Sequence, residues 1–133
     1  MKTEWKGAPM RIAILGAGHI GSTVGRLWHA AGHEVTFAAQ DTAEPAALAD
    51  ELGERAHAAT MTEAVAAAEV VLVAVPGTAV VDVLTAARSL DGRVVIDAAN
   101  MMSKDRLSLG QLADSFPRAR WVRVQHAPGA CTR

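Results

Sequence analysis

Short apolar runs alternate with segments of helical spacing along most of the chain. Runs of this kind, rich in β-branched residues, predict strands. The predicted strands span residues 11–15, 34–39, 70–75, 93–99 and 120–124, with a further short strand at 57–60. The run VVLVAV at 70–75 is continuous rather than alternating, which is typical of a strand buried on both faces.

The segments between these runs predict helices. Within residues 22–31, the apolar residues Val24, Leu27 and Trp28 share one helical face. Gly32 is expected to end this helix in a left-handed conformation. The next predicted helix is capped by Thr42 or Asp41, with Pro45 in its first turn and Leu48 and Leu52 one turn apart on one face. The other predicted helices are 62–68 with Thr62 as the cap, 78–88, and 106–116.

This alternation of strands and helices indicates parallel strands joined by crossover helices. We therefore expect an α/β fold, a doubly wound (Rossmann-type) and mainly parallel sheet of about six strands with helices on both faces. A chain of 133 residues has the length of one domain. We expect that domain to span residues 10–133, after a flexible extension at residues 1–9.

Four glycines follow the first predicted strand in the stretch LGAGHIGSTVG. At the carboxyl end of a strand and the start of a helix, such a loop is typical of dinucleotide binding. Gly16 allows the tight turn, and Gly18 leaves room for a pyrophosphate against the main chain. Gly21 lets the helix pack close to the sheet, and Gly25 extends that contact.

The first helix adds its own chemistry to this loop. Its amino terminus carries unpaired N–H groups and a partial positive charge, which suit an anion. The backbone N–H groups of His19 and Ile20 are expected to matter more than the His19 imidazole. The alternative interpretation is a glycine turn that binds no ligand.

The choice between NAD(H) and NADP(H) is usually made at the end of the second strand. An acid there binds the ribose 2′-hydroxyl of NAD(H), whereas Ser or Thr and Arg hold the 2′-phosphate of NADP(H). The corresponding positions are Ala39 and Gln40, and Asp41 follows them as a ribose contact or a helix cap. Because no acid stands at Ala39 to repel a phosphate, we expect a mild preference for NADP(H).

Composition excludes several classes of function. A formal net charge of −1 and a pI near 6.5 leave no basic face for nucleic acid. The single cysteine, Cys131, rules out an internal disulfide, and no Cys/His spacing predicts a metal site. No segment is long and apolar enough to span a membrane, and the amino terminus lacks the apolar core of a signal peptide. We therefore expect no membrane partner and a cytoplasmic location.

Three stretches together point to a known family: MRIAILGAGHIGSTVGRLWHAAGHEVTFAAQD, VVLVAVPGTAV and VVIDAAN. From about Met10 to Asn100 the chain resembles the N-terminal domain of deazaflavin-dependent NADP reductases (coenzyme F420:NADPH oxidoreductases). Members of this family pass a hydride between the nicotinamide and the deazaflavin ring. The resemblance therefore implies an oxidoreductase that uses NADP(H) and a small-molecule electron acceptor, with a deazaflavin coenzyme as the co-substrate.

The resemblance also implies which residues contact the cofactor. The residues at the pyrophosphate would be Gly16, Ala17, Gly18, His19, Ile20 and Gly21. The residues at the adenosine ribose would be Ala39, Gln40 and Asp41. The residues after the strand at 70–75 would be Ala74, Val75 and Pro76, and those on the nicotinamide side would be Ala99 and Asn100.

Hydride transfer requires positioning and exclusion of water more than a nucleophile or an acid–base pair, because the cofactor carries the chemistry. The sequence contains no evident pair of that kind. Asn100 and His126 are the candidate catalytic residues, since the resemblance brings both near the hydride-transfer cleft. Asp97 either binds the nicotinamide carboxamide or satisfies backbone groups at the end of its strand.

Two departures from the family keep other functions open. Ala39 and Gln40 replace the family's Ser/Thr–Arg pair at the 2′-phosphate, and the sequence stops at Arg133, where the family continues into a helical region that helps form the substrate pocket and the dimer. The first hypothesis is a reductase acting as a homodimer, which would also cover the edge strand at 120–124. The alternatives are a non-catalytic NAD(P)-binding module (a sensor or a subunit) and a truncated, inactive homologue.

Overall fold

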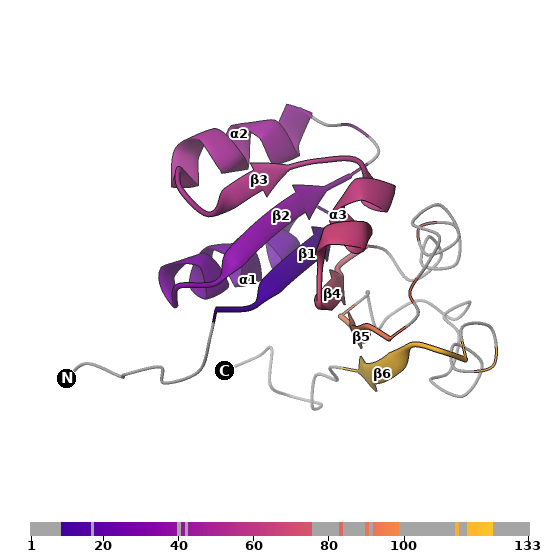
Figure 1. Cartoon of the computed structure of the whole chain (residues 1–133). Helices are drawn as coiled ribbons and strands as arrows, with labels where there is room; N and C mark the ends of the chain where they lie inside the picture. Colours follow the sequence, from indigo (N-terminus) through magenta and orange to yellow (C-terminus); the bar gives the residue numbers. More distant parts are fainter. Residues whose placement is uncertain are drawn as a thin grey trace, which may run out of the picture.

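A computed structural model of the chain describes residues 9–75 apart from positions 17, 40 and 42, residues 92–98 and 117–123, and the single positions 83, 90 and 114. Strands and helices alternate along the first half of the chain, as predicted (Figure 1). The elements are β1 (Arg11–Leu15), α1 (His19–Ala30), β2 (Glu34–Ala38), α2 (Ala43–Leu52), β3 (Ala56–Ala58), α3 (Met61–Ala67), β4 (Val70–Val73), β5 (Val94–Asp97) and β6 (Arg120–Arg123).

The six strands form one parallel sheet with the order β3-β2-β1-β4-β5-β6. The chain begins at the central strand β1, adds β2 and β3 on one side, and then crosses to β4 on the other side (Figure 1). The strand order therefore reverses between β1 and β4, and doubly wound folds bind ligands at the carboxyl ends of the strands beside such a point. The predicted doubly wound α/β fold is confirmed.

The core has one layer on each face of the sheet. Ile14 packs in a cluster covered by α1 and α2, together with Trp28 and Leu48. Leu15, the next residue along β1, packs on the opposite face with Val65 of α3. Because β1 is covered on both faces, its sequence is continuously apolar, as expected for a central parallel strand.

The strands end slightly earlier than predicted at their carboxyl ends. β2 ends at Ala38, β4 at Val73 and β5 at Asp97. Ala38 and Val73 both stand in register with Leu15, and Asp97 stands in register with Val73. Because the chain turns away after Leu15, the neighbouring strands lose their pairing partners beyond this row.

Helix α1 lies between two glycines, Gly18 before its first residue and Gly32 after its last turn. It starts at His19, earlier than the predicted residue 22, with Gly18 as its N-cap. At the other end, Gly32 has a φ of 101° and donates its N–H to the carbonyl of His29 at 3.0 Å, while His33 donates to Trp28 at 3.1 Å. The predicted left-handed end at Gly32 is confirmed.

The predicted cap of α3 is wrong. The helix begins at Met61, and its N-cap is Thr60 rather than Thr62. The N–H of Glu63 donates to Thr60 Oγ1 at 3.2 Å, and the Glu63 carboxylate accepts the N–H of Thr60 at 3.1 Å. This reciprocal capping box takes Thr60 away from the strand predicted at 57–60, so β3 ends at Ala58.

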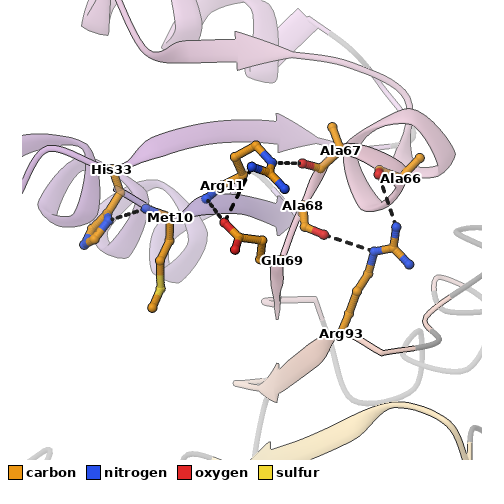
Figure 2. A network of polar contacts seen from close by, with 8 residues as sticks. All are labelled: Met10, Arg11, His33, Ala66, Ala67, Ala68, Glu69 and Arg93. Atoms are coloured by element: carbon orange, nitrogen blue, oxygen red, sulfur yellow. Dashed lines mark hydrogen bonds and ion pairs between the residues drawn. The ribbon is translucent and has the colours of Figure 1, made fainter. Parts of the chain in front are cut away.

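The opposite end of α3 is held by two arginines, Arg11 of β1 and Arg93 just before β5 (Figure 2). Arg11 Nε donates to the carbonyl of Ala67 at 2.9 Å, and Arg93 Nε donates to the carbonyl of Ala68 at 3.1 Å. These carbonyls would otherwise lack intrahelical partners, and the cations also suit the negative end of the helix dipole. Glu69 accepts the backbone N–H of Arg11 at 3.1 Å and lies 3.8 Å from its guanidinium. These hydrogen bonds connect the end of α3 to β1 and to the segment before β5 at the amino edge of the sheet.

Several predicted segments lie outside the described residues. They are the extension at 1–9 apart from Pro9, the helix at 78–88 apart from Val83, and the helix at 106–116 apart from Asp114. Val83 is buried in the cluster that contains α3. The single-domain boundary at residue 10 stays a prediction.

Candidate functional site

Gly16 makes the turn that leaves β1 and joins the ends of three strands. Its φ is +105°, a conformation that favours glycine, and its N–H donates to the carbonyl of Ala38 at 2.8 Å. A Cβ atom at this position would stand 2.5 Å from the carbonyl oxygen of Ala74 and 2.9 Å from Val75 Cγ1. The fold itself therefore requires glycine at position 16.

Gly21 and Gly25 allow α1 to pack closely on the sheet. A Cβ at Gly21 would collide with the carbonyl oxygen of Gly16 and would lie 3.1 Å from Ile14 Cγ2. A Cβ at Gly25 would lie 2.6 Å from Cζ of Phe37, whose side chain is fully buried. Both glycines are explained by packing, which agrees with the roles predicted from the sequence.

Gly18 differs from the other three glycines of the loop. It is exposed, and a Cβ built on it meets no atom of the described residues within 4 Å. Its φ of −76° and ψ of −161° are extended values that other residues adopt. Neither packing nor backbone conformation requires glycine at position 18.

The amino terminus of α1 is left without a cap. The helix has no side-chain cap and no acid in its first turn. The first backbone bond of the helix runs from the N–H of Ser22 to the carbonyl of Gly18 at 2.9 Å. The N–H groups of His19, Ile20 and Gly21 precede it and, within the described part of the chain, have no hydrogen-bond acceptor. These donors, with the positive end of the helix dipole, form a place for an anion.

The exposed side chains of the loop add little chemistry of their own. His19 is exposed, and its carbonyl accepts the Ser22 hydroxyl at 3.2 Å, but its imidazole has no polar partner among the described residues. Ile20 is 39 % exposed. The hydrogen-bonding capacity at this end of α1 therefore resides in the main chain.

The loop after β2 contains the residues predicted to face an adenosine ribose. Ala39 is half-buried, and Asp41 is exposed. Asp41 Oδ1 accepts the N–H of Ala43, the first residue of α2, at 3.0 Å. Asp41 therefore bonds the first N–H of this helix, whereas Thr42, the other cap that the sequence allowed, lies outside the described residues.

The end of β4 lies directly beside the glycine turn. Ala74 and Val75 are half-buried there, and both would contact a Cβ placed on Gly16. The structure thus brings the loop, the end of β2 and the end of β4 together at one edge of the sheet. The remaining predicted site residues lie outside the described residues: Ala17, Gln40, Pro76, Ala99, Asn100 and His126.

Asp97 at the end of β5 is a buried acid at this edge. Its side chain is 1 % exposed, and it stands in register with Val73. Such burial favours the interpretation that Asp97 serves the fold rather than a ligand. Within the described residues, no group of three or more His, Cys, Asp or Glu side chains is placed to hold a metal ion.

An ion pair between Arg26 and Glu51 joins α1 to α2. Arg26 lies about two helical turns after the glycine loop. Arg26 holds Glu51 through two hydrogen bonds, one of them 3.1 Å between Nη2 and Oε1. The hydrogen bond from Arg26 lowers the pKa of the Glu51 carboxyl and raises the pKa of Arg26. The pair connects the two helices on an exposed surface, where such contacts stabilise little.

Sequence comparison assigns the family. The model of the family described as "NADP oxidoreductase coenzyme F420-dependent" matches residues 11–101, which include the loop, both neighbouring strand ends and β5. The chain belongs to this family. A search of curated proteins found no match for this chain.

Solved structures similar to this family member support the same fold. One is a protein from Arthrobacter sp. FB24 named as a candidate F420-dependent NADP reductase, with 27 % identity and a TM-score of 0.72 over 86 % of this chain and 61 % of that chain. A reductive aminase from Aspergillus terreus in complex with NADPH has 27 % identity and a TM-score of 0.69, covering 87 % and 40 %. An imine reductase from the same organism has 25 % identity and a TM-score of 0.68, covering 92 % and 43 %.

The chain covers only part of the length of these neighbours. It spans about three fifths of the Arthrobacter protein and about two fifths of the two Aspergillus enzymes. In the part of the chain that the structure describes, no helix has both the length and the apolarity to cross a membrane.

Proposed function

We propose that residues 10–133 form the NADP(H)-binding domain of an oxidoreductase that transfers a hydride between nicotinamide and a deazaflavin or similar small-molecule acceptor. The observation that carries this proposal is Gly18. The other three loop glycines are required by backbone conformation or packing, whereas Gly18 faces open space at the uncapped end of α1. A ligand that approaches the main chain accounts for a glycine that the fold does not need.

The residues present fit a pyrophosphate. The N–H groups of His19, Ile20 and Gly21, which have no acceptor among the described residues, are donors for phosphate oxygens, and α1 has no first-turn acid that would repel a phosphate. Open space over Gly18 removes the steric barrier to such a contact. The NADPH complex of the Aspergillus reductive aminase, whose fold is similar, supports the choice of a dinucleotide.

The protein's contribution to the reaction is binding, orientation and exclusion of water. When bound, the nicotinamide ring supplies or receives the hydride, so the chain needs no nucleophile. Ala39, Gln40 and Asp41 would hold the adenosine ribose. Ala74, Val75 and Pro76 would border the cofactor after β4, and Ala99 and Asn100 would lie toward the nicotinamide. His126 and Asn100 stay the candidate catalytic residues.

Titration of the purified chain with NADPH tests the proposal. Gly18→Val should weaken NADPH binding by at least about 100-fold, because its side chain would fill the space that the pyrophosphate needs. The unfolding midpoint should stay close to that of the parent, since a Cβ at this position contacts nothing. Thr23→Val, which places the same valine side chain on the exposed surface of α1 away from Gly18, is the control and should bind normally. Unchanged NADPH binding by Gly18→Val would refute the loop assignment.

A second measurement separates an enzyme from a binding module. The chain is mixed with NADPH and an oxidised deazaflavin, and the absorbance of both chromophores is followed. Loss of both absorbances at equal rates is expected for hydride transfer. NADPH binding without turnover would select the non-catalytic module that the sequence left open.

We also propose that the chain forms a homodimer. Within the described residues β6 is an outer strand, and its Val122 is 49 % exposed. Exposed apolar edge strands tend to pair, and closed two-fold association is the commonest outcome. Light scattering should report about twice the chain mass of 13.9 kDa. A mass equal to one chain would contradict the dimer.

A further inference from the structure

Met10, the residue before β1, is bonded on both of its backbone groups to the segment that leads into β2. Its N–H donates to Nδ1 of His33 at 3.0 Å (Figure 2), and its carbonyl accepts the N–H of Glu34 at 3.0 Å. The side chain of Met10 is 40 % exposed. Polar contacts, more than apolar packing, therefore hold this residue at the amino edge of the sheet.

The next N–H along the chain has an acceptor of a different kind. The N–H of Arg11 donates to Oε1 of Glu69 at 3.1 Å, on the β4 side of β1 (Figure 2). An ordinary Glu carboxylate stays ionised above about pH 4.3 and accepts through either oxygen. An imidazole nitrogen accepts only while it carries no proton. The two adjoining bonds at the start of β1 therefore respond differently to mild acid.

The hydrogen bond from Met10 requires that Nδ1 of His33 carries no proton. A backbone N–H can only donate, so the ring nitrogen must be the acceptor. Imidazole side chains change charge between about pH 5 and pH 8. His33 also follows the carboxyl end of α1, where its N–H donates to the carbonyl of Trp28 at 3.1 Å, and a helix end of this polarity favours a cation. A proton taken up at Nδ1 would stand against the N–H of Met10.

Two other histidines at the same edge make contacts that tolerate a proton. Nε2 of His29 lies 2.6 Å from the carbonyl oxygen of Glu54, which can only accept. Nε2 of His57 lies 3.2 Å from Oε1 of Glu34, and this contact becomes an ion pair when the ring is charged. Proton uptake is therefore compatible with these two contacts and incompatible with that of His33. Further charged groups at this edge are Arg11, Arg55, Glu69 and Arg93.

We propose that His33 is a pH-sensitive anchor for the amino end of β1. The neutral imidazole holds the N–H of Met10, and proton uptake at Nδ1 breaks that hydrogen bond. The bonds from Glu34 to Met10 and from Arg11 to Glu69 remain, so the strand loses one attachment and keeps its place in the sheet. The glycine loop lies at the opposite, carboxyl edge, so the anchor acts without a bound dinucleotide.

Three variants separate the acceptor at position 33 from its titration. His33→Asn places a carbonyl oxygen where Nδ1 stands, and this oxygen accepts at every pH. His33→Ala removes the acceptor. His57→Gln is the matched control, because it removes another imidazole from the same edge without touching the bond to Met10.

Nuclear magnetic resonance of the full chain, without any ligand, measures both partners of the bond. The ¹⁵N shifts of the His33 ring report its protonation. The hydrogen-exchange rate of the Met10 amide, divided by that of an unstructured peptide at the same pH, reports its protection. An ordinary imidazole passes from about one tenth to about nine tenths protonated between about pH 7.5 and pH 5.5, so the protection of Met10 should fall about tenfold. The Arg11 amide, bonded to Glu69, is the internal reference and should keep its protection.

The protection of Met10 should fall with the same midpoint as the protonation of His33. His57→Gln should show the same fall, His33→Asn should keep the protection at both pH values, and His33→Ala should lack it at both. The proposal is overturned if Met10 stays protected while the His33 ring is charged, or if that ring stays neutral down to the acidic end of the titration. It is also overturned if His33→Asn loses protection as the parent does, or if His33→Ala keeps it.

Discussion

The amino termini of α1 and α3 follow strand ends of one sheet and yet are finished in opposite ways. At α3, Thr60 and Glu63 satisfy each other's backbone N–H groups in a capping box. At α1, the N-cap is Gly18, no side chain caps the helix, and the first turn has no acid. The N–H of Glu63 at the start of α3 is therefore bonded within the protein, whereas the first N–H groups of α1 have no acceptor among the described residues.

Helix α2 stands between these two cases. Its first N–H is bonded by the carboxylate of Asp41, which is itself exposed. A helix terminus at the carboxyl edge of a parallel sheet is therefore not by itself a binding site. The residue at the N-cap decides whether the donors are consumed by the fold or are available to an anion.

The largest effect on NADPH binding is expected when α1 is given a side-chain N-cap at position 18. Gly18→Asp should weaken NADPH binding by about 100-fold or more, because a carboxylate would accept the N–H groups intended for phosphate and repel it. The unfolding midpoint should stay equal or rise, since Asp is a better N-cap than Gly. Calorimetric titration and thermal unfolding measure the two effects.

Gly18→Asn provides the control for charge in this test. It supplies a cap of the same shape without the negative charge and should bind NADPH more tightly than Gly18→Asp does. Full NADPH affinity in Gly18→Asp would show that the uncapped end of α1 is not the phosphate site.

A weaker effect is expected when α3 loses its cap. Thr60→Ala should lower the free energy of unfolding by about 1 kcal/mol, because the N–H of Glu63 loses its acceptor. The NADPH dissociation constant should not change. Thr62→Ala is the control and should cost less, since Thr62 is not the N-cap. Chemical denaturation measures both variants, and an equal loss in the two would argue against the capping box.

The smallest effect concerns the exposed pair that connects α1 to α2. The hydrogen bond from Arg26 lowers the pKa of Glu51, so this pair contributes stability above the ordinary Glu pKa of about 4.3. That contribution is lost as the pH falls through the lowered pKa of the folded state. Glu51→Gln should therefore reduce the unfolding midpoint slightly at neutral pH and should flatten its decline in acid.

Thermal unfolding of the parent and Glu51→Gln over the acidic range measures this effect. The NADPH dissociation constant serves as the control and should be the same in both proteins, because the pair lies away from the glycine loop. Identical pH profiles for the two proteins would show that the contact carries no stability.

Local pattern predicted most of the fold because apolar runs and their spacing are properties of neighbouring residues. The glycine turn, the end of α1 at Gly32 and the parallel sheet are confirmed. The strand ends were predicted too long, because β2, β4 and β5 stop in register with Leu15, and register depends on residues distant in sequence. The cap of α3 was assigned to Thr62, although the Thr-x-x-Glu spacing at Thr60 and Glu63 was a readable signal.

The sequence by itself determined the element order and the glycine-rich loop, because these depend on apolar periodicity and on residues adjacent in the chain. Only the tertiary structure decided which glycines the fold requires. Gly16 is confined by Ala74, and Gly25 by Phe37, while Gly18 meets nothing. Those contacts join strands and helices that are far apart in sequence, so the space left open at Gly18 arises only when the sheet and α1 are assembled.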